Sequence, residues 1–91
     1  MSYQLPLFQF RLRNGMSIGP RALGRIWSSA SGSADATVSR ELRRTSNQQS
    51  DYVYALSGPA NLLDLPTVET TLRRLLQESL PMAHVELMRL L

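Results

Sequence analysis

The chain repeats one short pattern twice, and this repetition limits the folds that it can adopt. Each copy contains an alternating apolar strand pattern, an apolar stripe at helical spacing, and a second strand pattern. The first copy runs from Tyr3 to Thr45 and the second from Asp51 to Leu91. Two strand–helix–strand units in 91 residues predict one βαββαβ domain that spans residues 1–91.

The first copy begins with a strand that has one apolar face. Asn14-Gly15 then predicts a turn. Pro20 suits the first turn of a helix, because the backbone N–H that proline lacks would have no intrahelical partner there. Ser31-Gly32-Ser33 ends this helix. The apolar strand face consists of Phe8, Phe10 and Leu12, the opposite face of Gln9, Arg11 and Arg13, and the helical stripe of Leu23, Ile26, Trp27 and Ala30.

Residues 36–45 are compatible with two structures. As a strand, they place Val38 and Leu42 on one face with Arg40 between them. As a helix, they make Val38 and Leu42 neighbours one turn apart, with Asp35 or Ser33 as a cap. The strand is favoured, because the polar stretch 46–50 and then a strong strand pattern follow, as in a hairpin.

The second copy has the clearer signals. Residues 52–56 have high β preference, and Gly58-Pro59 is expected to end their strand. Asp64 can cap a helix whose first turn holds Pro66 and whose end is marked by Pro81. The apolar stripe of this helix is Leu65, Val68, Leu72, Leu75 and Leu76, and in the last strand Ala83, Val85 and Leu87 alternate with His84, Glu86 and Met88.

All of these stripes are buried at once if both helices pack on one face of a four-stranded antiparallel sheet. We therefore predict an α+β fold, a ferredoxin-like βαββαβ sandwich. The opposite sheet face stays uncovered, and two strand edges stay unpaired.

The composition of the chain excludes most kinds of catalytic site. The chain has no cysteine and one histidine, His84, so thiolate sites and histidine-rich metal sites are excluded. His84 and Glu86 share one strand face, which is more typical of a solvated surface than of an acid–base pair. We expect no catalytic residue, no metal and no cofactor, and a protein that is not an enzyme. With no apolar run of membrane-spanning length and no signal peptide, a cytoplasmic protein is expected.

The charge leaves a nucleic-acid role open. The net charge is +3, and all ten basic residues are arginine, which suits phosphate recognition. Tyr52 and Tyr54 alternate like the base-stacking aromatics of RNA-recognition motifs, although Asp51 precedes them where that motif has a basic residue and glycine. Residues 37–44 resemble the recognition helix of transposase-type helix-turn-helix domains.

The element order and length resemble those of ACT-like regulatory domains. Residues 20–26, Pro-Arg-Ala-Leu-Gly-Arg-Ile, are similar to the Pro-Gly-x-Leu-x-x-Ile pattern that begins their first helix. The resemblance implies a small amino-acid-like ligand between the first strand and the first helix, often at a dimer interface. Backbone N–H groups at a helix start suit a carboxylate, and the residues implied here are Asn14, Gly15, Gly19 and Arg21.

The predicted function is therefore a small non-enzymatic regulatory or protein-interaction module, with a nucleic-acid-binding protein as the alternative. A homodimer or a partner protein would cover the exposed sheet face, where we expect Tyr52 and Tyr54. Arg40, which has the parity of the inner face, is expected to block further pairing at an edge strand.

Overall fold

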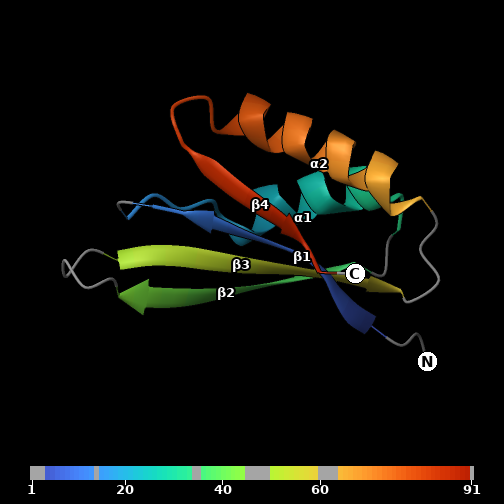
Figure 1. Cartoon of the computed structure of the whole chain (residues 1–91), viewed down its shortest axis with the longest axis horizontal. Helices are drawn as coiled ribbons and strands as arrows, with labels where there is room; N and C mark the ends of the chain where they lie inside the picture. The colour runs from blue at the N-terminus through green and yellow to red at the C-terminus, as the bar shows by residue number, and fades with distance from the viewer. Residues whose placement is uncertain (1–3, 14, 34–35, 45–49, 60–63, 91) are drawn as a thin grey trace.

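One antiparallel sheet with two helices on the same face makes up the fold in the computed structural model (Figure 1). The structure describes residues 4–13, 15–33, 36–44, 50–59 and 64–90. Asn14 lies outside these ranges. In chain order the elements are β1 (Gln4–Leu12), α1 (Pro20–Ser31), β2 (Thr37–Arg44), β3 (Ser50–Pro59), α2 (Leu65–Ser79) and β4 (Val85–Arg89).

The strands are ordered β2-β3-β1-β4, so β1 and β3 are central and β2 and β4 are the edges. Every neighbouring pair is antiparallel. It follows that β1 and β2 run parallel with β3 between them, and that β3 and β4 run parallel with β1 between them. Each helix thus connects two parallel strands across an intervening one. The predicted α+β architecture, with both helices on one sheet face, is confirmed.

Residues 37–44 form a strand, and the helix-turn-helix interpretation of this segment is wrong. The whole of β2 pairs with β3, from Thr37 opposite Ser57 to Arg44 opposite Ser50. This pairing supplies the backbone with hydrogen-bond partners along the segment. Tertiary pairing therefore decides a segment whose own pattern fits either structure.

The core lies between the helices and the covered sheet face. Phe8 meets Trp27 edge to face, with ring centroids 5.7 Å apart, a favourable arrangement for aromatic rings. The predicted stripes of both helices supply the rest of this core. Its fully buried side chains include Leu7, Phe8, Phe10, Leu12, Leu23, Trp27, Tyr54, Leu56, Leu72 and Leu76.

The strand β3 continues through Gly58-Pro59, where the sequence predicts a break. Beyond Ser57 it has no partner in β2 and pairs only with β1, so the missing N–H of Pro59 removes no bond to β2. A Cβ at Gly58 would lie 3.3 Å from Leu7 Cδ1, a tight contact that requires a small shift of that side chain, and 3.6 Å from Trp27 Cζ2, an ordinary van der Waals distance. The indole Nε1 of Trp27 also donates to the Ser57 carbonyl at 2.8 Å.

Tyr52 and Tyr54 face the helices, which corrects their expected place on the uncovered face. Phe10 is the cross-strand partner of Tyr54, and opposed residues in an antiparallel pair share a face. The two rings stack with centroids 4.7 Å apart, and Tyr54 is only 2% exposed. The uncovered face carries the other parity, whose described residues include Gln9, Arg11, Thr37, Ser39, Glu41, Arg43, Asp51, Val53, Ala55, Ser57, Glu86 and Met88.

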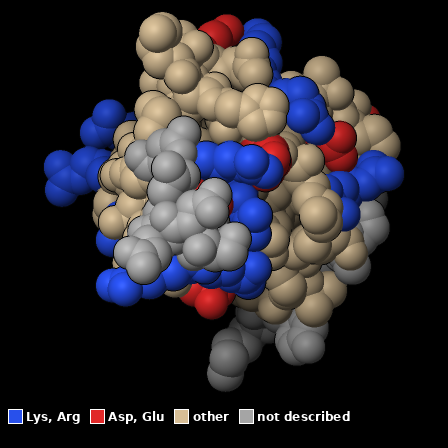
Figure 2. Space-filling view, turned by 60° about the vertical axis from the view of Figure 1, so that its left-hand side comes forward, with Lys and Arg blue, Asp and Glu red and all other residues tan. Residues whose placement is uncertain are grey.

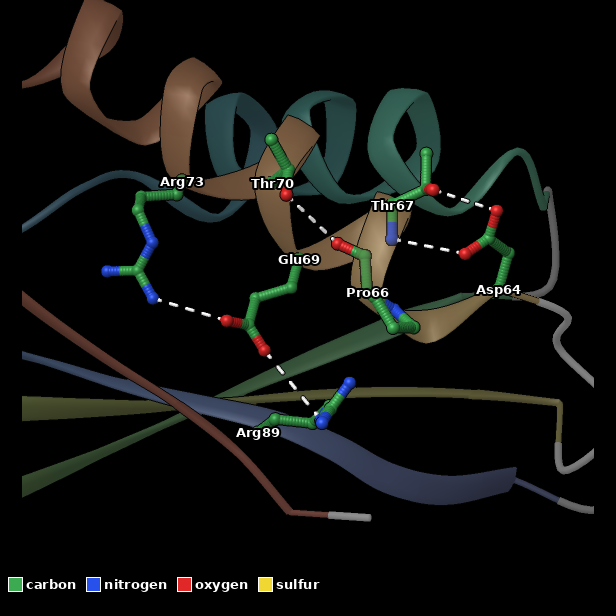
Figure 3. Close-up of polar contacts among 7 residues, drawn as sticks. All are labelled: Asp64, Pro66, Thr67, Glu69, Thr70, Arg73 and Arg89. Atoms are coloured by element: carbon green, nitrogen blue, oxygen red, sulfur yellow. Dashed lines mark hydrogen bonds and ion pairs between the residues drawn. The ribbon is translucent and has the colours of Figure 1, made fainter.

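The start of α2 is capped as predicted (Figure 3). The carboxylate of Asp64 accepts from the Thr67 backbone N–H at 3.3 Å and from the Thr67 hydroxyl at 2.7 Å. Glu69 then lies 3.4 Å from an Arg73 guanidinium nitrogen and 3.8 Å from one of Arg89. The second contact joins α2 to β4, although both ion pairs are solvent-exposed and contribute little to stability.

Removing the Tyr54 hydroxyl should destabilise the fold. It accepts from the Ile18 N–H at 2.9 Å and donates to the Ile18 carbonyl at 3.3 Å. We expect Tyr54→Phe to lower the free energy of unfolding by about 1–2 kcal/mol, because two buried backbone groups lose their partner. Chemical denaturation measures this. Tyr52→Phe is the matched control, since the Tyr52 hydroxyl has no hydrogen bond to a described residue; equal losses in the two variants would contradict the prediction.

Asp64 should matter both as a cap and as a backbone conformation. Its φ is 57°, a left-handed region that asparagine tolerates and alanine resists. We expect Asp64→Ala to cost about 1–2 kcal/mol of unfolding free energy, and Asp64→Asn to be close to neutral. Thermal and urea unfolding of both variants tests this. An asparagine variant as unstable as the alanine one would show that neither capping nor backbone conformation explains the position.

Candidate functional site

A hollow of about 310 Å³ opens between the β1–α1 connection, the start of α1 and strand β2. The Tyr54 hydroxyl holds Ile18 at its floor through both backbone groups. Leu23 is one of the helix-stripe residues that sequence periodicity identifies. The hollow is lined by Ile18, Pro20, Leu23, Val38, Ser39, Arg40 and Tyr54. Its volume is at the lower end of the range for small-molecule sites.

Arg40 supplies the cationic group of this hollow. Its guanidinium carbon lies 4.8 Å from the centroid of the Tyr52 ring, a cation–π contact. Among the described residues, no carboxylate is within ion-pair distance of Arg40. An apolar floor beside an arginine without an acidic partner is suited to a small molecule that has a carboxylate and an apolar part.

The start of α1 adds a second favourable feature for an anion. Gly19 is the N-cap residue, and it has no side chain to cap the helix. Pro20 occupies the first turn, which contains no acidic residue. The first backbone N–H groups of a helix lack intrahelical partners and carry a partial positive charge. This end of α1 borders the hollow through Pro20 and Leu23.

The structure separates the residues that the family resemblance groups as ligand-binding. Asn14 is outside the described ranges. Gly15 has a φ of 72° and donates its N–H to the Ser50 carbonyl at 2.9 Å, which ties the loop to the start of β3. Gly19 caps α1. Arg21 borders a second hollow rather than the one that Arg40 lines.

The second hollow, of about 690 Å³, runs along α1 beside β2 and is wide open. Val38 borders both hollows, so they are adjacent. Its lining is Arg21, Gly24, Arg25, Ser28, Ser29, Ala36 and Val38. Neither Arg21 nor Arg25 forms an ion pair with a described residue.

Sequence reasoning missed Ile18 and Val38 as site residues. Ile18 belongs to no periodic segment, so its burial was not readable from a pattern. Val38 was recognised as an inner-face residue of a strand, but its place opposite α1 depends on the crossover between β1 and β2. The sequence predicts Arg40 and Tyr54 as interface residues, and the structure places both in the lining of the hollow.

The uncovered face carries an ion-pair network around Glu86. Its Oε1 accepts from Arg13 Nη2 at 2.6 Å, and His84 Nε2 lies 4.0 Å away. The Glu86 carboxylate, which an acid–base pair with His84 would require, is therefore paired with Arg13. Asp51, which is 4% exposed, lies opposite Arg43 across the β2–β3 ladder. Oppositely charged cross-strand neighbours are a structural feature of sheets.

The uncovered face offers no stacking platform for RNA in the part of the chain that the structure describes. None of its described β-ladder residues is aromatic, whereas RNA-recognition motifs stack bases on sheet aromatics. The hypothesis that Tyr52 and Tyr54 stack bases on this face is wrong. Arginine side chains nevertheless gather at the hairpin end of the molecule (Figure 2), where β2 ends with Arg43 and Arg44.

Within the described ranges, no group of acidic or histidine side chains is arranged to hold a metal ion. No helix in those ranges is long and apolar enough to cross a membrane.

The chain is similar in fold to a designed protein. Among solved structures it matches the de novo designed protein Foldit4 with a TM-score of 0.57 and 19% sequence identity, over 98% of each chain. At that identity the similarity concerns the fold alone. No protein-family model and no curated protein matches the chain.

The contact between Arg40 and Tyr52 should be visible in solution. A guanidinium over a ring face experiences the ring current, so the Arg40 side-chain protons should resonate upfield of those of Arg44. Tyr52→Leu should abolish this shift and change stability by less than about 1 kcal/mol. Tyr52→Phe keeps the ring and should keep the shift. Arg40 resonances that are unchanged in the leucine variant would rule out the contact.

Proposed function

We propose that the protein is a non-enzymatic regulatory module that binds a small carboxylate ligand in the hollow between α1 and β2. The observation that carries the proposal is Arg40, a guanidinium at the edge of an apolar hollow with no acidic partner among the described residues. The ligand class comes from this chemistry: one carboxylate with an apolar part.

The binding mode follows from the lining residues. The ligand carboxylate pairs with the Arg40 guanidinium, whose planar fork suits two parallel hydrogen bonds. The apolar part of the ligand lies against Ile18, Leu23 and Val38. The uncapped start of α1 adds a favourable electrostatic contribution to binding a negative charge near Pro20. A ligand of this kind contacts α1 and β2 at once and stabilises their packing.

We also propose that the fold is the ferredoxin-like arrangement of ACT-like regulatory domains. Two crossover units of the strand–helix–strand type, with β1 and β3 central in the sheet, support this assignment. The segment that resembles the start of their first helix, residues 20–26, borders both hollows. The place implied for a ligand, between the first strand and the first helix, coincides with the hollow at Ile18 and Pro20.

The Tyr52 and Tyr54 dimer surface does not form part of the proposal, because Tyr54 is 2% exposed. Nucleic-acid binding has no specific support either, since the helix and the aromatic sheet face on which it depended are absent from the described residues. It remains an outcome of the experiment, as binding to RNA or DNA that weakens steeply with salt.

Thermal unfolding in the presence of small carboxylates tests the proposal. A panel of branched-chain and aromatic amino acids and 2-oxo acids should contain a ligand that raises Tm, and a ligand at a hundred times its Kd stabilises by about 2.7 kcal/mol. Arg40→Gln should weaken binding about tenfold, because a charge-assisted hydrogen bond is lost. Arg74→Gln, on the exposed surface of α2, is the matched control. Equal binding by the two variants would refute the site.

A further inference from the structure

The outer edge of β2 is a long unpaired strand edge. Among the described residues its eight residues pair with β3 on one side only, so backbone groups along the other side have no strand partner in the described sheet. The opposite edge strand, β4, has five residues. Arg40 does not cover the β2 edge, because its guanidinium lies over the ring of Tyr52 on β3. Arg40 has the inner-face parity that the sequence predicts for it, and its role in blocking further pairing at this edge stays a prediction.

The side chains beside this edge have a regular chemistry. On the helix-covered face, β2 alternates apolar and basic residues, from Val38 and Arg40 to Leu42 and Arg44. Leu42 is 52% exposed. Across the adjacent hollow, α1 adds Arg21 and Arg25. In α1 and β2 the one acidic residue is Glu41, which has the parity of the uncovered face.

A second copy of the chain does not complement this edge. Antiparallel pairing of β2 with itself aligns seven residues in two registers. One is centred on Arg40 and the other on Glu41, so each places a charged residue directly opposite its own copy. Like charges that face each other across a strand pair are destabilising. The edge is better matched by a strand whose acidic residues meet the arginines.

We infer that the β2 edge and the hollows beside it bind an extended acidic segment of a partner protein by strand addition. The segment carries apolar and acidic residues in alternation on the face toward α1, so that carboxylates meet Arg40 and Arg44 while apolar side chains meet Val38 and Leu42. Backbone hydrogen bonds to β2 provide affinity, and the side chains provide specificity. The inference rests on the proposed function, because both assign a carboxylate to Arg40. It deepens that function by naming an acidic side chain of a partner protein as the source of the carboxylate.

Two synthetic peptides of eight residues, the length of β2, test the inference by isothermal titration. In the first, valine and glutamate alternate along one face and threonine fills the other. The second has the same composition, with the glutamates moved to the opposite face. The first should bind about tenfold more tightly, the difference expected for a lost charge-assisted contact. Equal affinity would overturn the inference.

N-methylation of the first peptide separates strand addition from simple charge attraction. Successive N–H groups of a strand point to opposite sides. Methyl groups on the alternate amides that face β2 should therefore abolish binding, and methyl groups on the other amides should leave it unchanged. Equal binding by the two methylated peptides would overturn strand addition. A dimeric mass in light scattering that the peptide converts to a monomer would instead assign the edge to a second copy.

Arg25→Gln distinguishes this inference from the proposed function. Arg25 borders the second hollow and not the first, so its loss should weaken peptide binding by about fivefold and leave small carboxylates unaffected. Arg74→Gln is again the control. Stabilisation by small carboxylates without peptide binding would overturn the inference alone. Peptide binding without any small-carboxylate effect would overturn the proposed small ligand alone.

Discussion

The contact between Tyr54 and Ile18 is the interaction on which the candidate site depends. Tyr54 is fully inside the core, stacked on Phe10 of the neighbouring strand, and its hydroxyl satisfies both backbone groups of Ile18. A loop that would otherwise bury an unpaired N–H and carbonyl is thereby held against the sheet. This side chain and the hydrogen bond from the Gly15 N–H to the Ser50 carbonyl together hold the β1–α1 connection against β3.

The same stacked pair explains why the two sheet faces differ in composition. Phe10 and Tyr54 occupy opposed positions in the central strand pair, so the β1 residues of this parity face the helices from Phe8 onward, and a register shift between Pro6 and Phe8 reverses the parity before that point. The other parity carries mostly polar and charged residues together with Val53, Ala55 and Met88, and this face forms local ion pairs such as Arg13 with Glu86. The two hollows lie at the β2 side of the molecule, beside α1, and Arg40 there has no acidic partner among the described residues.

Much of the architecture was predictable because it depends on local patterns. Alternation predicted the strands, the 3.6-residue period predicted both helical stripes, and Asp64 with Pro66 predicted the start of α2. Failures occurred where a residue's role depends on a distant partner. Gly58-Pro59 has the composition of a break, yet the strand continues because β1 pairs with it. Tyr52 and Tyr54 were assigned to the wrong face, since their parity relative to Phe10 depends on strand register.

The sequence by itself determined the number and order of the elements and the type of all but residues 37–44, because period and turn chemistry are local properties; pairing with β3 made that segment a strand. The sequence also excluded cysteine chemistry, and it showed that every Lys or Arg position in the chain is arginine. The tertiary structure decided which face each strand residue occupies and which arginines border a hollow. Register and crossover bring Arg40 beside Ile18 and Leu23, residues 22 and 17 positions away in the chain. No local pattern encodes that proximity, since it arises from packing α1 against the sheet.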